Sequence, residues 1–145
     1  MKVITINVCG IRSSQRKGIF DWLSRSKADH ICMQETRALE EQIDNHNFIL
    51  KGYTRYMNIA VKKGYSGVAI YSKHKPSKII NTFSKSIFEE EGRFISLEFE
   101  HYIVASIYFP SGSSGEERQK MKYEFMALFE KYVKKEIKKK KTLIL

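Results

Sequence analysis

Two polar side chains follow two short apolar segments, and together they could serve metal-ion chemistry. Asn7 closes the segment 2–7 (KVITIN), and Glu35 comes directly after the segment 30–34 (HICMQ). A hard cation such as Mg2+ prefers one or two carboxylates in proteins, with water and phosphate oxygens as its other ligands. Glu35 is therefore a candidate metal ligand, although a carboxylate at the end of a strand can equally be a solvated side chain.

Other positions could meet a phosphate group. Tyr108 ends an apolar segment just before the loop 110–115 (PSGSSG), where its hydroxyl could approach a phosphoryl oxygen or simply face water. Gly64 and Tyr65 lie in a GYSG segment that could present an aromatic ring to a sugar-phosphate backbone or form a plain hairpin turn. Arg12 follows the first apolar segment and a glycine, a pattern that also fits an ordinary tight turn.

Several other chemistries find no support in the residue pattern. The histidines show no metal-ligand spacing, and no Ser/His/Asp or Cys/His set of nucleophile and base is readable. The sequence has neither a Walker-type phosphate loop nor a dinucleotide-binding fingerprint. Its two cysteines, Cys9 and Cys32, lie in apolar contexts and suggest neither a disulfide scaffold nor a zinc site.

The order of the first predicted elements brings Asn7 and Glu35 together. Alternating β-branched residues predict a strand over 2–7, apolar residues at helical spacing predict a helix over 18–26, and a compact apolar run predicts a buried strand over 30–34. A strand–helix–strand unit is almost always a right-handed crossover between parallel strands. Parallel strands end at one edge of their sheet, where ligands bind in open α/β folds, so both side chains are expected there.

The rest of the chain predicts more strands and one long helix. Strands are predicted over 54–61, 67–72, 78–83, 93–99 and 102–108. His101 lies between the last two, which predicts a hairpin turn there. From Glu116 onwards apolar residues follow a 3.6-residue period, which predicts a helix. We therefore expect an α/β fold without a linker or an internal repeat. The segment 142–145 (TLIL) is either a short final strand or part of a larger domain within which the chain is cut.

The charge balance favours a polyanionic partner. The chain has 145 residues, with 26 Lys and Arg against 16 Asp and Glu, and a formal net charge of +10 at pH 7. Nucleic acid is the commonest such partner, and an anionic membrane surface is another. A lysine-rich proteome, or a solvated helix face over 131–141, would explain the same excess without any ligand. No apolar run is long enough to span a bilayer and no secretory signal is visible, so we expect a reduced, cytoplasmic protein.

Five segments in order resemble the exonuclease III type of abasic-site endonuclease, within the endonuclease/exonuclease/phosphatase superfamily. They are ITINVCGIR, ADHICMQETRA, GYSGVAIYSKHKP, EEEGRFISLEF and IYFPSGSSGEERQ, and the resemblance runs over residues 1–145. The resemblance implies a four-layered α/β sandwich of two sheets, of which residues 1–145 are the N-terminal portion of a single domain. It also implies a protein of the bacterial cytosol or nucleoid.

The resemblance further implies a function. Members of the family use Mg2+ or Mn2+ to hydrolyse phosphodiesters, and they cleave DNA 5′ to abasic sites and trim 3′ ends. Glu35 is expected to hold the metal with Asn7 beside it, and Tyr108 matches the active-site tyrosine. This fits the chemistry, because a divalent ion polarises the scissile phosphate and lowers the pKa of a bound water.

The DNA-binding residues that the resemblance implies flank this site. Arg12 and Lys17 are expected to grip phosphates after the first strand. Gly64 and Tyr65 are expected to approach the DNA backbone from the other side. Basic residues in such positions neutralise the duplex and make binding depend on salt.

Two departures from the family bear on activity. Cys9 stands where the family usually has Asn or Asp, and a thiol is a poor ligand for a hard ion. The family's Gly-Asp-x-Asn motif and its terminal Asp-His pair have no counterpart in these residues. We therefore expect a truncated or split protein that is inactive alone. Besides DNA, its expected partner is a second polypeptide that supplies the C-terminal half.

Three alternative functions remain open. The chain could belong to a phosphodiesterase of the same superfamily that acts on lipid or inositol phosphates. It could bind nucleic acid without catalysis, or it could be the product of a decaying gene. Salt-dependent DNA binding without metal-dependent cleavage would distinguish the binding protein from the enzyme.

The expected truncation also predicts an incomplete core. If the chain supplies mainly one of the two sheets, the inner face that carries Leu97, Val104, Ile107 and Ile144 lacks a partner layer. An exposed apolar patch of more than a few hundred Å2 invites association. We therefore expect the isolated chain to be aggregated or molten.

Overall fold

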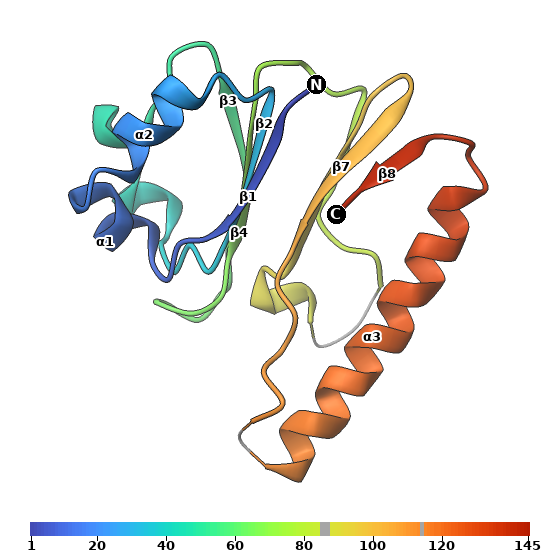
Figure 1. Cartoon of the computed structure of the whole chain (residues 1–145). Helices are drawn as coiled ribbons and strands as arrows, with labels where there is room; N and C mark the ends of the chain where they lie inside the picture. Colours follow the sequence, from blue (N-terminus) through green and yellow to red (C-terminus); the bar gives the residue numbers. More distant parts are fainter. Residues whose placement is uncertain (85–87, 114) are drawn as a thin grey trace.

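The predicted strands form two four-stranded sheets in the computed structural model, which describes residues 1–84, 88–113 and 115–145 (Figure 1). The first sheet has the order β1 (Val3–Asn7), β2 (His30–Gln34), β4 (Val68–Ser72) and β3 (Thr54–Asn58). The second has the order β5 (Lys78–Ile80), β6 (Phe94–Glu98), β7 (Tyr102–Ile107) and β8 (Thr142–Ile144). The α-helices are α1 (Ile11–Arg16), α2 (Ile19–Ser26) and α3 (Glu116–Ile137), and short 3-10 turns lie at Glu40–Gln42, His46–Phe48 and Glu89–Glu91.

Strand pairing confirms the crossover and the hairpin that the sequence predicts. β1 and β2 are parallel, and Asn7 pairs with Gln34 at their carboxyl ends. β6 and β7 are antiparallel, with His101 in the connection between them. The Gln34 side chain donates a hydrogen bond of 3.0 Å to Ser106 near the end of β7. The carboxyl ends of β1, β2 and β7 therefore meet at one edge of the molecule.

The period-2 alternation of the strands builds three apolar cores between four layers. Met33 of β2 faces a core shared with α1 and α2, whereas its neighbour Cys32 faces a core between the two sheets. On the other side, Ala105 of β7 packs against Tyr132 of α3. The resulting order of helix, sheet, sheet and helix confirms the α/β sandwich that the resemblance implies (Figure 1).

The expectation of an inner sheet face without a partner layer is wrong. The chain supplies both sheets, because its first four strands pair with one another and its last four do the same. Leu97 and Val104 are fully buried between the sheets, and Ile144 packs against the same cluster. Ile107 does not belong to the inner face at all, since it packs in the cluster formed with α3. The truncation argument for a molten chain therefore loses its structural basis.

Most predicted bounds agree with the structure to within one residue, and the larger differences concern β3, β5 and the segment after β1. β3 ends at Asn58 rather than at residue 61, and the Asn58 side-chain amide there donates to the backbone carbonyls of Asn81 and Phe94, at 2.7 and 2.8 Å. β5 ends at Ile80 rather than at residue 83. The segment after β1, interpreted as a tight turn, begins the helix α1, which is too short to show an apolar period.

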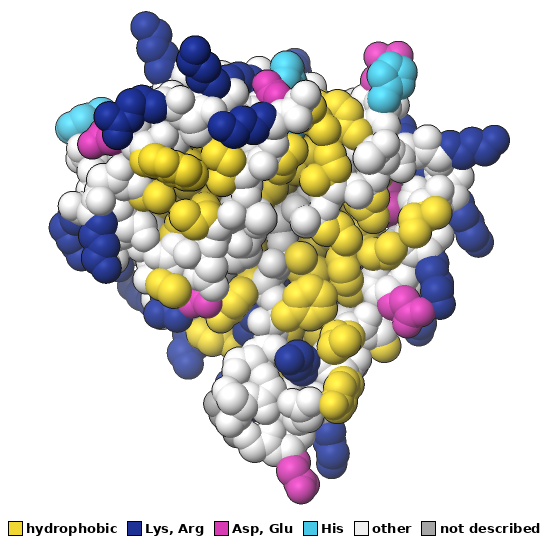
Figure 2. All heavy atoms as spheres, in the orientation of Figure 1, with side chains coloured by type: hydrophobic (Ala, Val, Ile, Leu, Met, Phe, Trp, Pro, Cys, Tyr) yellow, Lys and Arg dark blue, Asp and Glu magenta, His cyan; other side chains and the backbone are white. Residues whose placement is uncertain are grey.

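Charged and apolar side chains occupy different parts of the surface. On the face shown in Figure 2, apolar side chains extend along the seam between the two sheets, and Lys and Arg side chains project around its margins. In the described part of the chain, no helix is both long and apolar enough to cross a membrane.

A buried histidine at the opposite end of β2 from the site makes stability depend on pH. His30 is fully buried, and its Nε2 lies 3.0 Å from the Tyr102 hydroxyl, with the rings of His74 and Phe99 beside it. Burial, reinforced by the nearby charge of His74 and opposed by that of Asp29, lowers the pKa of His30 to about 4. Because this folded pKa lies below the ordinary value of about 6.5, the contribution of neutral His30 to stability is fully present above pH 6.5 and is lost as the pH falls towards 4.

We expect this titration to remove roughly 3 kcal/mol of the free energy of unfolding between pH 6.5 and pH 4. Urea unfolding of the chain and of His30→Gln at both pH values measures it, and the loss should be smaller in the variant. His101→Gln is the control, because the His101 side chain is 84% exposed. An equal pH dependence in the chain and in His30→Gln would contradict the assignment.

Candidate metal and phosphate site at one edge of the sheets

Three segments are joined by backbone hydrogen bonds at the edge where β1 and β2 end. The Gly10 amide donates to the Glu35 carbonyl at 2.7 Å, and the Thr36 amide donates to the Gly67 carbonyl at 3.0 Å. Gly67 must be a glycine, because its φ is +86° and an added Cβ would lie 2.2 Å from the Thr36 hydroxyl oxygen. The loop that joins β3 to β4, which carries Gly64 and Tyr65, is thereby fixed beside Glu35.

The backbone of this edge is strained. Six non-glycine residues with positive φ occur in residues 1–84, 88–113 and 115–145, and four of the six lie here: Cys9, Glu35, Arg37 and Ser66. Left-handed backbone is costly for residues with a Cβ and persists only where the surroundings enforce it. Such strain collects at functional sites, which marks this edge on physical grounds alone.

Glu35 is the central side chain of the edge and is only 8% exposed. The Asn7 side-chain amide donates to its Oε1 at 2.6 Å, and the Arg37 guanidinium donates to its Oε2. Burial raises the pKa of the Glu35 carboxyl, but the hydrogen bonds from Asn7, Tyr108 and Arg37 and the charge of Arg37 together leave that pKa below its usual value. Glu35 is therefore an anion at neutral pH.

Tyr108 reaches Glu35 from the second sheet. Ser106 donates to the Met33 carbonyl at 3.0 Å, which joins the end of β7 to β2 and sets the position of Tyr108 two residues later. The Tyr108 hydroxyl lies near enough to the Glu35 carboxylate for each group to shift the pKa of the other. Burial, together with the interaction with the Glu35 carboxylate, raises the pKa of the Tyr108 phenol. The phenol therefore stays protonated and remains a hydrogen-bond donor at neutral pH.

Cys9 fixes the orientation of Asn7. The Asn7 Oδ1 accepts hydrogen bonds from the Cys9 amide at 3.0 Å and from its thiol at 3.3 Å. With its oxygen held in this way, the amide nitrogen of Asn7 faces Glu35. The thiol thus acts on Glu35 through Asn7.

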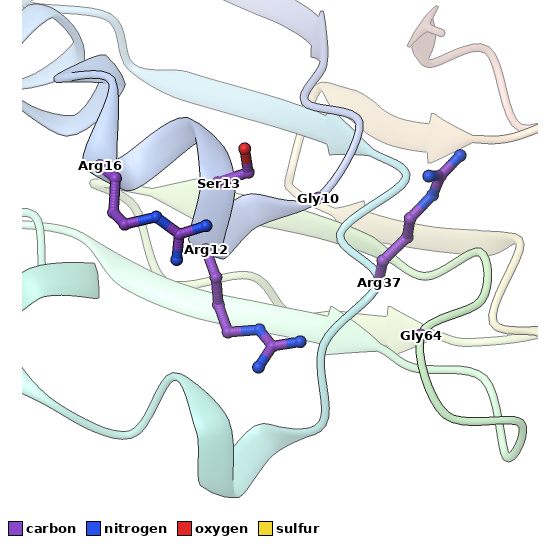
Figure 3. Close-up of a pocket in the computed structure, with 6 residues that line it drawn as sticks. All are labelled: Gly10, Arg12, Ser13, Arg16, Arg37 and Gly64. Atoms are coloured by element: carbon purple, nitrogen blue, oxygen red, sulfur yellow. The ribbon is translucent and has the colours of Figure 1, made fainter.

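An arginine-lined cavity of about 360 Å3 adjoins this cluster. Arg12 and Arg16 reach it from α1, the Gly64 loop borders its other side, and Arg37 lies between them (Figure 3). In this view the Arg37 side chain extends away from the other two, consistent with its ion pair with Glu35. Arginine binds phosphate oxygens through several directed donors, so the cavity suits a phosphate group.

The structure brings most of the predicted site residues together. Asn7 is hydrogen-bonded to Glu35, and Tyr108 lies close enough to Glu35 to influence its pKa. Of the other candidates, Arg12 and Gly64 line the arginine cavity, whereas Lys17 is exposed beyond the end of α1 and does not line it. Tyr65 instead accepts a hydrogen bond of 2.6 Å from the buried Arg93.

Three arginines of this region, Arg16, Arg37 and Arg93, were not predicted as site residues from the sequence. Arg16 lies one helical turn after Arg12, but this spacing means little without a predicted α1. Arg37 follows Glu35 by two residues, and a basic residue so near a candidate metal ligand was a usable signal. Arg93 lies opposite Tyr108 when the β6–β7 hairpin is extended by one pair beyond Phe94 and Ile107, so strand register could have found it.

Known proteins resemble this chain over nearly all its length. A model described as "Endonuclease/Exonuclease/phosphatase family" matches residues 4–139. An exodeoxyribonuclease of Bacillus subtilis is 38% identical over 146 residues, which cover 100% of this chain and 56% of that relative. The DNA repair nuclease APEX1 of Danio rerio is 31% identical over 117 residues, which cover 79% of this chain and 38% of that relative. The chain thus spans little more than half of these curated relatives at most.

Solved structures give the same result for the fold. An AP endonuclease from Archaeoglobus fulgidus superposes with a TM-score of 0.79 at 28% identity, covering 93% of this chain and 52% of that one. A 3′-5′ exonuclease from Neisseria meningitidis has a TM-score of 0.85 at 20% identity, covering 99% and 55%. At that lower identity the likeness concerns the fold alone.

Proposed function

The chain belongs to the endonuclease/exonuclease/phosphatase family, and from this premise we propose that it acts in a DNA-repair nuclease of the exonuclease III type. The proposed reaction is metal-assisted hydrolysis of phosphodiesters, 5′ to abasic sites and at 3′ ends. The observation that carries the proposal is the buried, ionised Glu35 beside a cavity lined by three arginines. A carboxylate suits a divalent ion, and arginines suit the DNA backbone.

The donor set fits a hard cation in kind. Glu35 would hold Mg2+ or Mn2+ through its carboxylate oxygens. Asn7 would orient that carboxylate, because its amide nitrogen donates to Oε1 of Glu35 while its oxygen accepts from Cys9. Bound there, the ion would polarise a phosphodiester and lower the pKa of a coordinated water. Within the described residues no cluster of three or more His, Cys, Asp or Glu accompanies Glu35, so we expect binding in the millimolar range by order of magnitude.

Tyr108 and the arginines would position the substrate. The phenol of Tyr108 stays protonated, so its one O–H can donate a hydrogen bond to a phosphoryl oxygen. Arg12 and Arg16 would each bind a phosphate of the DNA backbone, with Gly64 leaving room for that backbone on the far side of the cavity. Lys17 would add a more distant cation, and Tyr65 would contact the backbone from the loop between β3 and β4.

For the 145-residue chain alone we propose little or no cleavage. It offers one carboxylate for the metal, and stabilisation of charge at the reacting phosphate is usually the largest catalytic contribution. A polypeptide that carries the family's Gly-Asp-x-Asn and Asp-His residues would be the partner that completes the site.

Complementation tests the proposed function. The chain is mixed with the part of the Bacillus subtilis exodeoxyribonuclease that it does not cover, and a duplex with one abasic site is added with Mg2+. We expect incision 5′ to the abasic site in the mixture, none with either polypeptide alone, and a loss of at least 100-fold in Glu35→Gln, by order of magnitude. Incision that survives Glu35→Gln would contradict the proposal, and hydrolysis of inositol phosphates instead of DNA would favour the lipid-phosphate alternative.

A further inference from the structure

Arg93 is a buried cation behind the site, and each of its three side-chain nitrogens has a partner. Its side chain is 3% exposed. Nη2 donates to the Tyr65 hydroxyl at 2.6 Å, Nη1 donates to the Tyr108 backbone carbonyl at 3.2 Å, and Nε forms an ion pair with Glu91. Burying a guanidinium is costly unless it is paired and hydrogen-bonded, and here each of its nitrogens donates to a partner.

The guanidinium also contacts two aromatic rings. Its Cζ lies 5.4 Å from the ring centroid of Tyr65 and 5.0 Å from that of Tyr108. Tyr65 belongs to the loop between β3 and β4, whereas Tyr108 follows β7 in the other sheet. Through hydrogen bonds and cation–π contacts, Arg93 therefore connects two segments that the polypeptide chain keeps far apart.

The backbone around Arg93 is built for this position. The Tyr108 amide donates to the Arg93 carbonyl at 2.8 Å, so the two residues are cross-strand neighbours. Gly92 adopts a φ of +57°, and a Cβ on it would lie 2.4 Å from the Ile59 carbonyl carbon. Only a glycine lets the chain before β6 approach the segment after β3 so closely. Gly92 thus allows the two segments to approach each other, and Arg93 places its guanidinium between Tyr65 and Tyr108.

We infer that Arg93 is a positioning residue that holds Tyr65 and Tyr108 on the two sides of the nucleic-acid site. The inference rests on the function proposed above, since the two tyrosines matter there for DNA and for Glu35. Arg93 touches neither the metal ligand nor the arginine cavity, so its effect must pass through the tyrosines. Lysine cannot replace it, because one ammonium lacks the planar fork that reaches both partners.

The first test is spectroscopic and needs no DNA. The chain is labelled with [13Cζ]tyrosine, and the signals of Tyr65 and Tyr108 are identified from Tyr65→Phe and Tyr108→Phe. We expect Arg93→Gln and Arg93→Lys to shift both signals and to leave the other tyrosines in place. The matched control is Arg55→Gln, which removes a partly buried arginine that donates to the Ile43 carbonyl at 2.8 Å and should move neither signal. Unmoved Tyr65 and Tyr108 signals in the Arg93 variants would overturn the inference.

The second test is a double-mutant cycle of duplex binding followed by fluorescence anisotropy. We expect Arg93→Gln to weaken binding about fivefold, and Tyr65→Phe to add little in that background, because the phenol acts only while Arg93 holds it. Fully additive losses would overturn the inference. Absence of duplex binding by the unsubstituted chain would count against the proposed function, while the tyrosine signals still decide the role of Arg93.

A variant that fails to fold would not leave the question open. If Arg93→Gln unfolds, Tyr65→Phe reads the same contact from the other side. Loss of the Tyr65 hydroxyl releases Nη2 of Arg93, so the Tyr108 signal must move. A Tyr108 signal that does not respond to Tyr65→Phe would show that Arg93 does not couple the two residues.

Discussion

Replacing Arg12 and Arg16 together with glutamine is expected to weaken duplex DNA binding roughly 60-fold near 0.1 M salt. Both side chains line the arginine cavity, and neither has an ion pair in the described structure. Each phosphate that a protein neutralises contributes about 0.9 to the slope of log K against log salt, so loss of two contacts removes about 1.8 from that slope. Anisotropy of a labelled duplex over a salt series measures both quantities.

The matched control removes the same two charges elsewhere. Lys138 and Lys140 are exposed and follow the C-terminal end of α3. The segment that contains Tyr108 leads instead to the N-terminal end of this helix. Lys138→Gln with Lys140→Gln should change the slope much less, because these cations lie away from the site. A control that matches the arginine pair would mean that the lysine-rich helix, and not the cavity, binds DNA.

Truncating Leu97 to alanine is expected to lower the free energy of unfolding by about 2–5 kcal/mol. Leu97 is fully buried between the two sheets, among Cys32, Ile70 and Val104. Removing its side chain loses the transfer free energy of the buried groups and leaves a cavity in a core that cannot collapse without moving two sheets. Urea unfolding at pH 7 measures the change.

Ile79 provides the control for Leu97. It is the cross-strand partner of Leu97 in the β5–β6 pair, so it lies on the same face of the sheet, but it is 48% exposed. Ile79→Ala should therefore cost clearly less than Leu97→Ala, because less apolar surface is lost from the core and water already reaches the site. Equal costs, or a Leu97→Ala variant as stable as the parent, would contradict a closed core between the sheets.

Much of the fold follows from local patterns that extend over several residues. Alternation over 2–7 and 30–34, with helical spacing between them, is enough to predict a parallel pair, and β1 and β2 confirm it. The hairpin at His101 has the same origin. These predictions are correct because the alternation of residues along each strand indicates which of its faces is buried.

The division of the strands between two sheets could not be predicted in this way. Ile107 and Val104 are both apolar, yet one packs towards α3 and the other between the sheets. Val104 and Ile107 are three positions apart on β7, so they lie on opposite faces of the sheet. Which of the two faces is the inner one depends on the layers that pack against the sheet. That information is non-local. The wrong expectation of a bare inner face came from assuming that a truncated chain supplies mainly one of the two sheets, whereas it supplies both.

In the candidate site, too, some residues could be placed from local patterns and others depend on contacts between distant segments. Asn7 and Glu35 could be placed together because two strand ends of one parallel pair must meet at an edge. Tyr108 could be singled out as a phenol at a strand end, but its position near Glu35 depends on hydrogen bonds between the two sheets that local sequence patterns do not predict. Arg93 could be placed beside Tyr108 only once the register of β6 and β7 was known.

Paramagnetic broadening by Mn2+ tests the central claim most directly, namely that Glu35 holds a divalent ion. In 15N-labelled chain, small additions of Mn2+ should first broaden the amide signals of Asn7, Cys9 and Glu35, and Mg2+ in excess should restore them. In Glu35→Gln this broadening should disappear. Broadening that persists in Glu35→Gln, or that centres on the exposed acidic turn Glu89–Glu91, would contradict the account.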